Sequence, residues 1–567
     1  MIDYSVSRKQ AQKDGTLPDW YTTGGFQLIN EKEYISKEET VRDRYSTIAT
    51  TLSEHMPEEL KEEYNKIFFD LLWDGYLSPS TPVFSNIGTN KGMPIACSGS
   101  YVLDSVDSFY KVSHEIAMLS KEGFGTSVYL GSIRPRGSLI STGGKADGIV
   151  PVMELLFNTT SHVSQGSNRR GSIACYIPVD HGDFWECVHF IENNPDHTNI
   201  GWLLSDKSLS LIKNKDEEMS KRYAKVLYLR MQGTGYLHFT DKADRLSPQV
   251  YKDNKLKISA SNLCSEIYLH SSEEYTYTCC LSSINLTKWD EIVERDYIDV
   301  FNSIIFLDCV NSEFIKRSKG KKGLKKARAF AEWSRPVGLG VMGLGTYFQS
   351  KGIQFDGLDG QFTNQAIFKK LSEVTHEANK YLGTLMGESP LMKGTGLRMS
   401  HTQAIAPTMS TALIMGGVSN GIEPYFANIF TQVSAGGEIR RANPILVSLM
   451  KKKGIWNKSY IDRIIEDEGS IQNIEEFSPE EKLVLRTAFE CDQGALARMN
   501  DQRSKYVDQG ISFNLFILAS SSEERISELH QQIINSKYIK GVYYVRSSAG
   551  INARTQLTES TCSSCEG

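Results

Sequence analysis

Several residues of this chain have the types and spacing that redox chemistry requires. Asn262, Cys264 and Glu266 place an amide, a thiol and a carboxylate within five residues. Two more thiols follow at Cys279-Cys280, and the chain ends with the pair Cys562 and Cys565. A thiol can exchange a hydrogen atom, a carboxylate can move a proton, and a further dithiol can restore reducing electrons by exchange. No single member of this set indicates that chemistry, but the whole set does.

The group around Cys264 is not typical of a nucleophilic cysteine. A nucleophilic thiol needs a neighbouring base, and the nearest histidine, His270, lies four residues beyond Glu266. A nearby carboxylate raises the pKa of a thiol and disfavours the thiolate. A neutral S–H group that exchanges a hydrogen atom fits these neighbours. Taken alone, the pentapeptide is also compatible with a purely structural role.

Length and composition are those of a globular protein. The chain has 567 residues, of which 40% are hydrophobic and 23% charged, with a formal net charge of -5. This net charge does not indicate general binding to nucleic acid or to a membrane surface. No run of apolar residues is long enough to span a bilayer, and the polar N-terminus does not look like a signal peptide. Ten cysteines are too few for a disulfide scaffold of this length. We expect a soluble, cytoplasmic protein.

Apolar periodicity predicts alternating helices and strands after a helical N-terminal region. Residues 1–80 are expected to be mainly helical, with a helix over 58–72, and residues 80–96 to form a polar loop. Strands are expected near 100–103 and 125–133, and helices over 105–120 and 150–162. The alternation favours an α/β body with a mainly parallel sheet over 81–551, and residues 552–567 are expected to form a flexible tail.

Six motifs in order resemble the large, catalytic subunit of class I ribonucleotide reductases. They are Asn-Leu-Cys-x-Glu at 262–266, Cys-x-Leu-Ser-x-x-Asn-Leu at 279–286, Gly-Leu-Gly-Val-x-Gly-Leu at 338–344, Asn-Gly-Ile-Glu-Pro at 420–424, Asp-Gln-x-x-Ser-x-Asn at 508–514, and the pair Tyr543-Tyr544. The resemblance covers roughly residues 75–567. It implies a ten-stranded α/β barrel of two five-stranded parallel halves, with Cys264 on a finger loop in the centre.

The resemblance also implies roles in the reduction of ribonucleoside diphosphates to deoxyribonucleotides for DNA synthesis. Cys264 would hold a transient thiyl radical that removes the 3′-hydrogen of the ribose. Glu266 would accept the proton of the 3′-hydroxyl, and Asn262 would hydrogen-bond the sugar or the reacting groups. Cys97 and Cys279 would supply two electrons and become a disulfide as the 2′-hydroxyl leaves as water. We expect Cys280 to take no part.

Two nucleotide sites follow from the same resemblance. The substrate would contact Asn262 and Glu266, and also the residues Thr81, Ala96, Thr408, Met409, Ser410 and Thr411, of which 408–411 begin a helix suited to the diphosphate. From the residues alone, a helix cap is the better interpretation of this segment. Asp104 and Arg134 would bind a dNTP or ATP effector with Mg²⁺, and residues 193–199 would join effector to substrate.

The C-terminal motifs imply partners. Tyr543 and Tyr544 would relay an electron and a proton from a small, radical-generating subunit that carries the metallocofactor. The alternative to a relay role is that the two tyrosines belong to an ordinary strand, since aromatic residues favour sheets. Cys562 and Cys565 would reduce the active-site disulfide and be re-reduced by a thioredoxin- or glutaredoxin-like protein. Half a zinc site is the alternative. We expect a homodimer, with no metal or covalent cofactor in this chain.

Two other enzymatic functions, and a regulatory homologue without activity, remain as alternatives. An adenosylcobalamin-dependent reductase would need no partner subunit, and a thiol–disulfide exchange protein would need no nucleotide. A regulatory homologue without activity is disfavoured because every expected catalytic position is filled. Only about 80 residues precede Thr81, too few for the N-terminal domain through which many relatives sense dATP. We therefore expect that dATP does not switch off overall activity through such a site.

Overall fold

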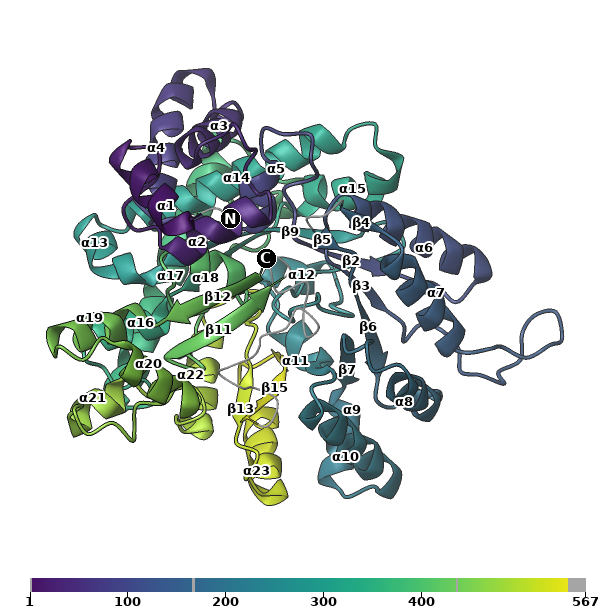
Figure 1. The fold of residues 1–567 in the computed structure, drawn as a ribbon. Helices are drawn as coiled ribbons and strands as arrows, with labels where there is room; N and C mark the ends of the chain where they lie inside the picture. The colour runs from purple at the N-terminus through teal and green to yellow at the C-terminus, as the bar shows by residue number, and fades with distance from the viewer. Residues whose placement is uncertain (1–2, 166–168, 435–436, 549–567) are drawn as a thin grey trace.

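The N-terminal region is helical, as predicted. The computed structural model describes residues 3–165, 169–434 and 437–548 (Figure 1). The first helices start at polar caps, and in one of them Thr40 and Asp43 satisfy each other's backbone amides as a capping box. The region comprises α1 (Tyr4–Lys13), α2 (Thr23–Glu31), α3 (Val41–Ser53), η1 (Glu58–Leu60) and α4 (Lys61–Trp73).

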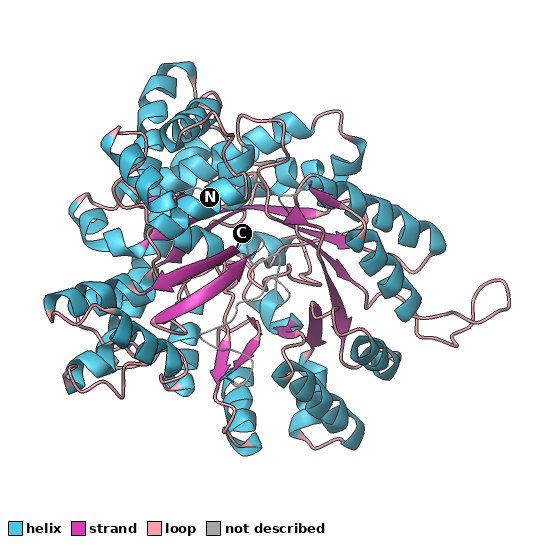
Figure 2. Cartoon of the chain, in the orientation of Figure 1, coloured by secondary structure: helices cyan, strands magenta, loops and turns pink. Residues whose placement is uncertain are grey.

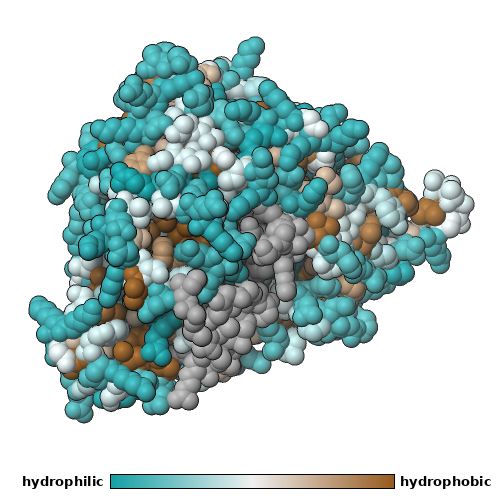
Figure 3. Space-filling model, turned by 45° about the horizontal axis from the view of Figure 1, so that its top comes forward, coloured by the Kyte–Doolittle hydropathy of each residue, from teal (hydrophilic) through white to brown (hydrophobic). Residues whose placement is uncertain are grey.

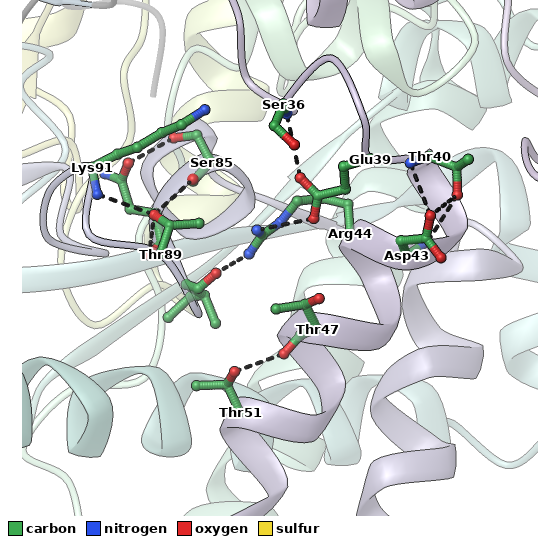
Figure 4. Close-up of polar contacts among 12 residues, drawn as sticks. Ser36, Glu39, Thr40, Asp43, Arg44, Thr47, Thr51, Ser85, Thr89 and Lys91 are labelled. Atoms are coloured by element: carbon green, nitrogen blue, oxygen red, sulfur yellow. Dashed lines mark hydrogen bonds and ion pairs between the residues drawn. The ribbon is translucent and has the colours of Figure 1, made fainter.

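A buried arginine fastens these helices to the segment that leads into the sheet. Arg44 on α3 forms an ion pair with Glu39 at 3.3 Å and donates a hydrogen bond to the Ile87 carbonyl (Figure 4). The segment around Ile87, to which Arg44 is bound, is not the continuous loop expected over 80–96. It contains a short helix, α5 (Thr81–Asn86), because Pro82 in the first turn has the fixed φ that suits a helix start.

The first half of the barrel is a five-stranded parallel sheet. Its strands, in spatial order, are β2 (Cys97–Tyr101), β3 (Thr126–Tyr129), β6 (Ile173–Pro178), β7 (Ile200–Leu204) and β8 (Tyr236–Phe239). The helices of this half are α6 (Val106–Lys121), α7 (Val150–Ser161), α8 (Phe184–Asn193), α9 (Asp206–Lys213) and α10 (Glu217–Met231). Figure 1 shows these helices outside the arc of strands, as expected for parallel strands joined by helical crossovers.

The second half is also parallel and has five members. Strand β9 (Tyr277–Asn285) pairs with β10 (Val337–Met342). Parallel bridges from Leu339 to Gln403 and from Ile405 to Ile511 add two further segments to this half of the barrel. The segment that follows Ile511 continues as β13 (Leu515–Ile517), which pairs with β15 (Val545–Ser547). The helices of this half are α13 (Trp289–Glu294), α14 (Ile298–Ser318), α15 (Lys325–Ser334), α16 (Leu344–Ser350), α17 (Leu358–Leu385), α18 (Met409–Ile414), α22 (Gln493–Ser504) and α23 (Glu523–Ile534).

Antiparallel pairs join the two halves into the ten-stranded barrel that the family resemblance implied. On one side β2 pairs with β9, and on the other β8 pairs with β14 (Gly541–Val542), which runs into β15. A short strand, β1 (Leu77–Pro79), adds to the far end of β9. The parallel sheet that the sequence predicts is therefore correct within each half, and the antiparallel joints lie between the halves. Figure 2 shows the strands surrounding the centre of the molecule.

Several boundaries differ from the sequence prediction. The strand expected at 100–103 begins earlier, at Cys97, and the strand expected over 125–133 is only β3. The helices expected at 58–72, 105–120 and 150–162 are found, each within about three residues. The earlier start of β2 matters most, because it places Cys97 inside the sheet.

The remaining elements surround the barrel. They are β4 (Ser164–Gln165), β5 (Arg169–Arg170), α11 (Thr240–Arg245), α12 (Gln249–Asp253), η2 (Leu286–Lys288), η3 (Lys322–Leu324), η4 (Pro390–Met392), β11 (Ile429–Ser434), β12 (Gly437–Ala442), α19 (Pro444–Lys452), α20 (Lys458–Glu466) and α21 (Pro479–Val484). Hydrophilic residues cover most of the face seen in Figure 3, with smaller hydrophobic patches between them. Within the described ranges, none of the helices is both long and apolar enough to cross a membrane.

A buried ionic cluster stabilises the second half. Asp308 on α14 accepts hydrogen bonds from Arg335 at 2.9 Å and from Arg398 at 2.7 Å, and its side chain is only 2% exposed. Burial opposes ionisation of this carboxyl group. The charges of the two guanidinium groups and their hydrogen bonds outweigh that effect and hold the pKa of Asp308 below its usual value.

Replacing Asp308 by Ala should therefore leave two buried, uncompensated cations. We expect the free energy of unfolding to fall by about 3–5 kcal/mol, measured by urea denaturation. Asp107→Ala provides the matched control, because its ion pair with Lys111 is exposed and contributes little. An equally small effect of both substitutions would contradict this account of the cluster.

Candidate active site

The finger loop that carries Cys264 is held in shape by its own side chains. It lies between α12 and β9, and residues 260–269 are buried. The Asn262 side-chain oxygen accepts hydrogen bonds from the backbone amides of Glu266 at 3.0 Å and Ile267 at 3.1 Å. Ser265 has a positive φ of 62°, a conformation that turns the chain sharply. The loop is thus a tight turn that presents Cys264 and Glu266 from neighbouring positions.

Polar contacts tie this loop to both halves of the barrel. Asn262 donates to the Cys97 sulfur at 3.1 Å, and the Cys97 thiol lies 4.0 Å from a Glu266 carboxylate oxygen. On the other side, Ser512 donates to the second Glu266 oxygen at 3.1 Å and the Gly510 amide donates to the Glu266 carbonyl at 2.8 Å. The thiol of one half and the hydroxyl of the other therefore meet at one carboxylate.

Cys97 and Cys279 lie opposite each other where the two halves join. They are directly paired in the antiparallel register of β2 and β9, and such residues have Cβ atoms about 4.5–5.5 Å apart. Because side chains alternate along a strand, Cys280 points to the opposite face, in a different part of the core. The structure brings Cys97 and Cys279 together and places Cys280 apart from them.

The environment keeps Cys279 protonated. Burial raises the pKa of this thiol well above its usual value, and the nearby Cys280, Cys97 and Glu266 add to the rise. A hydrogen bond from the Gln509 side-chain amide, with 3.5 Å between the nitrogen and the sulfur, only partly opposes it. Cys279 is therefore a poor metal ligand or nucleophile at rest, because both roles require the thiolate. It is suited to chemistry that starts from S–H.

The tyrosine pair packs into the same apolar cluster as Cys264. The cluster, which we call the tyrosine cluster, consists of Ala174, Tyr176, Leu203, Tyr236, Ala260, Leu263, Cys264, Tyr543 and Tyr544. The rings of Tyr543 and Tyr544 have centroids 4.3 Å apart. The Tyr544 hydroxyl donates to the Asn199 side-chain oxygen at 2.7 Å. The pair is thus buried and in contact, with a defined hydrogen-bond partner for the outer phenol.

The segment expected to bind phosphate does begin a helix. Thr408 precedes α18 in the left-handed conformation, with φ 56°, and its hydroxyl accepts a hydrogen bond from the Gly421 amide at 2.8 Å. The first amides of a helix, here from Met409 to Thr411, have no partner within the helix. Thr81 and Ala96 are buried in α5 and just before β2.

Asp104 and Arg134 form an ion pair at the carboxyl ends of β2 and β3. Arg134 also lines a cleft of about 640 Å³, whose other walls include Asp180, His181 and Lys257. The segment 193–199 runs from the end of α8 to β7. Its last residue is the Asn199 that binds Tyr544, so this segment reaches the tyrosine cluster.

Sequence reasoning missed three residues of the site. Ser512 and Gln509 belong to a motif that was noted but given no role, and the motif's position in the chain did not show that it faces Glu266 and Cys279. Asn199 carried no signal as a partner of Tyr544. Cys562 and Cys565 lie outside the described residues. Among the described residues no disulfide is formed and no cluster of His, Cys, Asp or Glu suits a metal ion.

Comparisons with known proteins agree with this geometry. A family model described as the ribonucleotide reductase barrel domain matches residues 95–228, 223–395 and 389–545. A second model, the ribonucleotide reductase all-alpha domain, matches residues 25–92. Together they span most of the chain.

Individual relatives are similar over nearly the whole length. A putative ribonucleoside-diphosphate reductase large subunit of Frog virus 3 is 28% identical, with 92% of this chain and 95% of the relative covered. The corresponding large subunit of Caenorhabditis elegans is 27% identical over 94% of this chain and 77% of its own. The class Id ribonucleotide reductase alpha subunit of Actinobacillus ureae superposes with a TM-score of 0.84 at 33% identity, covering 96% of this chain and 98% of that one.

A barrel of two parallel halves, with a cysteine-bearing loop beside two facing thiols, defines a thiol-dependent oxidoreductase. The chain belongs to the ribonucleotide reductase large-subunit family.

A further carboxylate borders the site. Glu423 accepts a hydrogen bond from Asn514 at 2.7 Å and lines a small cavity together with Met409 and Arg546. Burial raises the pKa of Glu423 to about 7, although the Asn514 hydrogen bond and the charge of Arg546 oppose the rise. Asn514 also accepts from the Tyr544 amide at 3.2 Å, which connects this carboxyl group to the tyrosine pair.

This raised pKa makes stability depend on pH. In the unfolded chain Glu423 ionises near its ordinary value of 4.5, whereas the folded chain holds the proton up to about 7. Stability from this group is full below about pH 4.5 and is lost as the pH rises through 7. Glu423→Gln should reduce the fall in the urea midpoint between about pH 5 and about pH 8. An unchanged pH dependence would show that another group causes it.

Proposed function

We propose that this chain is the catalytic subunit of a ribonucleoside-diphosphate reductase that reduces ribonucleotides to deoxyribonucleotides for DNA synthesis. The observation that carries the proposal is the meeting of Cys97 and Cys279 at the joint between the halves, with Asn262 and Glu266 in reach of them. A redox-active dithiol next to a buried carboxylate, on a loop that also bears Cys264, supplies each group that the reaction needs.

The proposed reaction divides its steps among these groups. A thiyl radical on Cys264 removes the 3′-hydrogen of the ribose while Glu266 takes the 3′-hydroxyl proton. The 2′-hydroxyl then leaves as water, and Cys97 and Cys279 provide two electrons and two hydrogens as they form a disulfide. Cys264 finally returns a hydrogen atom to the 3′ carbon and becomes a radical again. Asn262 keeps the loop and the Cys97 thiol in position through its amide contacts.

The diphosphate would bind at the start of α18. The backbone amides of Met409, Ser410 and Thr411 and the helix dipole favour an anion there. The Thr408 hydroxyl is already bound to Gly421, so we assign Thr408 to holding the loop as well as to binding. Thr81 and Ala96 complete the proposed substrate site from the opposite side.

Nucleotide effectors would bind near the ion pair of Asp104 and Arg134. An effector triphosphate with Mg²⁺ would compete for the arginine, which lies beside the cleft at the carboxyl ends of the strands. Its influence on base preference requires only differential binding to two states, with residues 193–199 as the connection to the substrate. We further propose that the active chain is a homodimer in the cytoplasm.

The radical would come from a small partner subunit with a metallocofactor. Tyr544 and Tyr543, in ring contact inside the tyrosine cluster, would pass it to Cys264. The tail cysteines Cys562 and Cys565 would reduce the Cys97–Cys279 disulfide by thiol exchange and be restored by a thioredoxin- or glutaredoxin-like protein.

Reduction of CDP with and without a candidate small subunit tests the whole proposal. Deoxycytidine diphosphate should form only when the partner, a reductant and an effector are all present. Activity with adenosylcobalamin and no partner protein would favour the cobalamin-dependent class instead.

Cys264→Ser tests the radical position. Serine keeps the shape of the side chain but removes the S–H bond that exchanges hydrogen, so CDP reduction should vanish while nucleotide binding remains. Cys280→Ser is the matched control, since it removes a buried thiol from the other face and should retain turnover. Deoxynucleotide formation by Cys264→Ser would contradict the mechanism.

The tail variants Cys562→Ser and Cys565→Ser separate the two dithiols. Pre-reduced enzyme should still complete roughly one turnover from Cys97 and Cys279, but should not cycle with thioredoxin. A small dithiol that enters the site should restore cycling. Normal multiple turnover with thioredoxin would rule out the shuttle.

A further inference from the structure

A third tyrosine contacts both members of the tyrosine pair. Tyr236, at the start of β8, is fully buried. Its ring centroid lies 5.5 Å from that of Tyr543 and 5.8 Å from that of Tyr544. The rings of the pair itself are closer, with centroids 4.3 Å apart. Tyr236 nevertheless contacts the ring of each member of the pair.

The array continues from Tyr236 toward the finger loop. The ring of Tyr176 on β6 lies 5.7 Å from that of Tyr236. The Tyr176 hydroxyl donates to the Asn262 carbonyl at 2.6 Å, two residues before Cys264. Four tyrosine rings thus lead from Asn199, which binds the outer phenol, to the backbone of the loop that bears the reactive thiol.

The sheet is built to allow this contact. Tyr176, Gly201 and Tyr236 stand side by side on β6, β7 and β8 in the strand register. A Cβ atom at Gly201 would lie 2.2 Å from the Tyr176 ring, so no other residue fits there without moving that ring. Because Gly201 has no side chain, the two rings approach each other over the middle strand.

Packing alone does not require a tyrosine at this position. Phenylalanine would fill nearly the same volume and could keep the same ring contacts with Tyr543 and Tyr544. Tyrosine adds a phenol that can be oxidised. In contact with two phenols that carry a radical, such a group can exchange an electron and a proton with them.

We propose that Tyr236 is a third redox-active tyrosine of the relay. When Tyr543 or Tyr544 is a phenoxyl radical, the Tyr236 phenol gives it one electron and the hydroxyl proton. The acceptor becomes a phenol again, Tyr236 becomes the phenoxyl radical, and the reverse exchange restores it. The step needs no oxidant beyond the partner subunit, so the inference rests on the proposed function. Tyr236 is a side branch that holds the radical within contact of the direct route.

Replacement of Tyr236 by 3-aminotyrosine tests this branch, because the amino-substituted phenol is easier to oxidise and traps a radical that reaches it. The full chain would be mixed with the radical-generating subunit, CDP and effector, frozen, and examined by electron paramagnetic resonance. We expect an aminotyrosyl signal at position 236. Tyr268 is the matched control: it is also buried, but its ring stacks on His238 and not on either member of the pair. Its variant should give no signal.

The same replacement at Tyr543 distinguishes failure of the Tyr236 branch from failure of the relay itself. A signal at 543 and 236 but not at 268 supports the branch. A signal at 543 without one at 236 overturns it. No signal at 543, 544 or 236 contradicts the relay itself, and with it this inference. If the 236 variant does not bind CDP, 3-fluorotyrosine is the smaller substitution. Fluorine splitting should then mark a radical at 236, and splitting seen only for fluorotyrosine at 543 overturns the branch.

Discussion

The antiparallel pairing of Cys97 with Cys279 is the constraint on which the rest of this structure depends. It lies at one of the two antiparallel contacts that join the parallel halves into one barrel, the other being β8 with β14. Directly paired residues have Cβ atoms about 4.5–5.5 Å apart, close to the 3.5–4.5 Å of a disulfide. The thiols can therefore be oxidised with only a small movement of the strands. This joint between the halves is also the site that the proposed reaction oxidises.

The finger loop depends on that joint from the inside. The Asn262 side-chain oxygen accepts hydrogen bonds from the loop's own amides, and its side-chain nitrogen donates one to Cys97. Glu266 is approached by the Cys97 thiol from one half and by Ser512 from the other. An unpaired carboxylate or amide would be costly at this depth. The same contacts that avoid this cost fix where Cys264 lies relative to the dithiol.

Much of the fold and the chemistry could be predicted from the sequence, and the reasons are local. Apolar periodicity predicts the alternation of helices and strands. Asn262, Cys264 and Glu266 are close enough in sequence to be recognised together. The preference for Cys279 over Cys280 came from its place at the head of the motif, and the structure adds that side-chain alternation along β9 separates the two thiols. The helix α5 was missed because a polar, glycine-containing composition outweighed the signal of Pro82.

Contacts between distant segments could not be predicted in this way. Ser512 is 246 residues from Glu266, Gln509 is 230 from Cys279, and Asn199 is 345 from Tyr544. Each pair meets because the barrel closes, and no local pattern encodes that closure. The contact of Tyr236 with the tyrosine pair has the same origin, since β8 and β14 come together from distant parts of the chain.

The order of strands in the barrel has a consequence for biosynthesis. The first half and the finger loop are complete once the ribosome has passed β9, but the segments that carry Ser512, Tyr543 and Tyr544, next to β13, β14 and β15, are among the last to be made. Pairing between segments so far apart is slow, because the loop between them must close first. A nascent or truncated chain thus contains its thiols without the segment that, in the proposed function, would deliver a radical to them. Under that proposal, radical chemistry at these thiols has to wait until the C-terminal segment has been made and has folded.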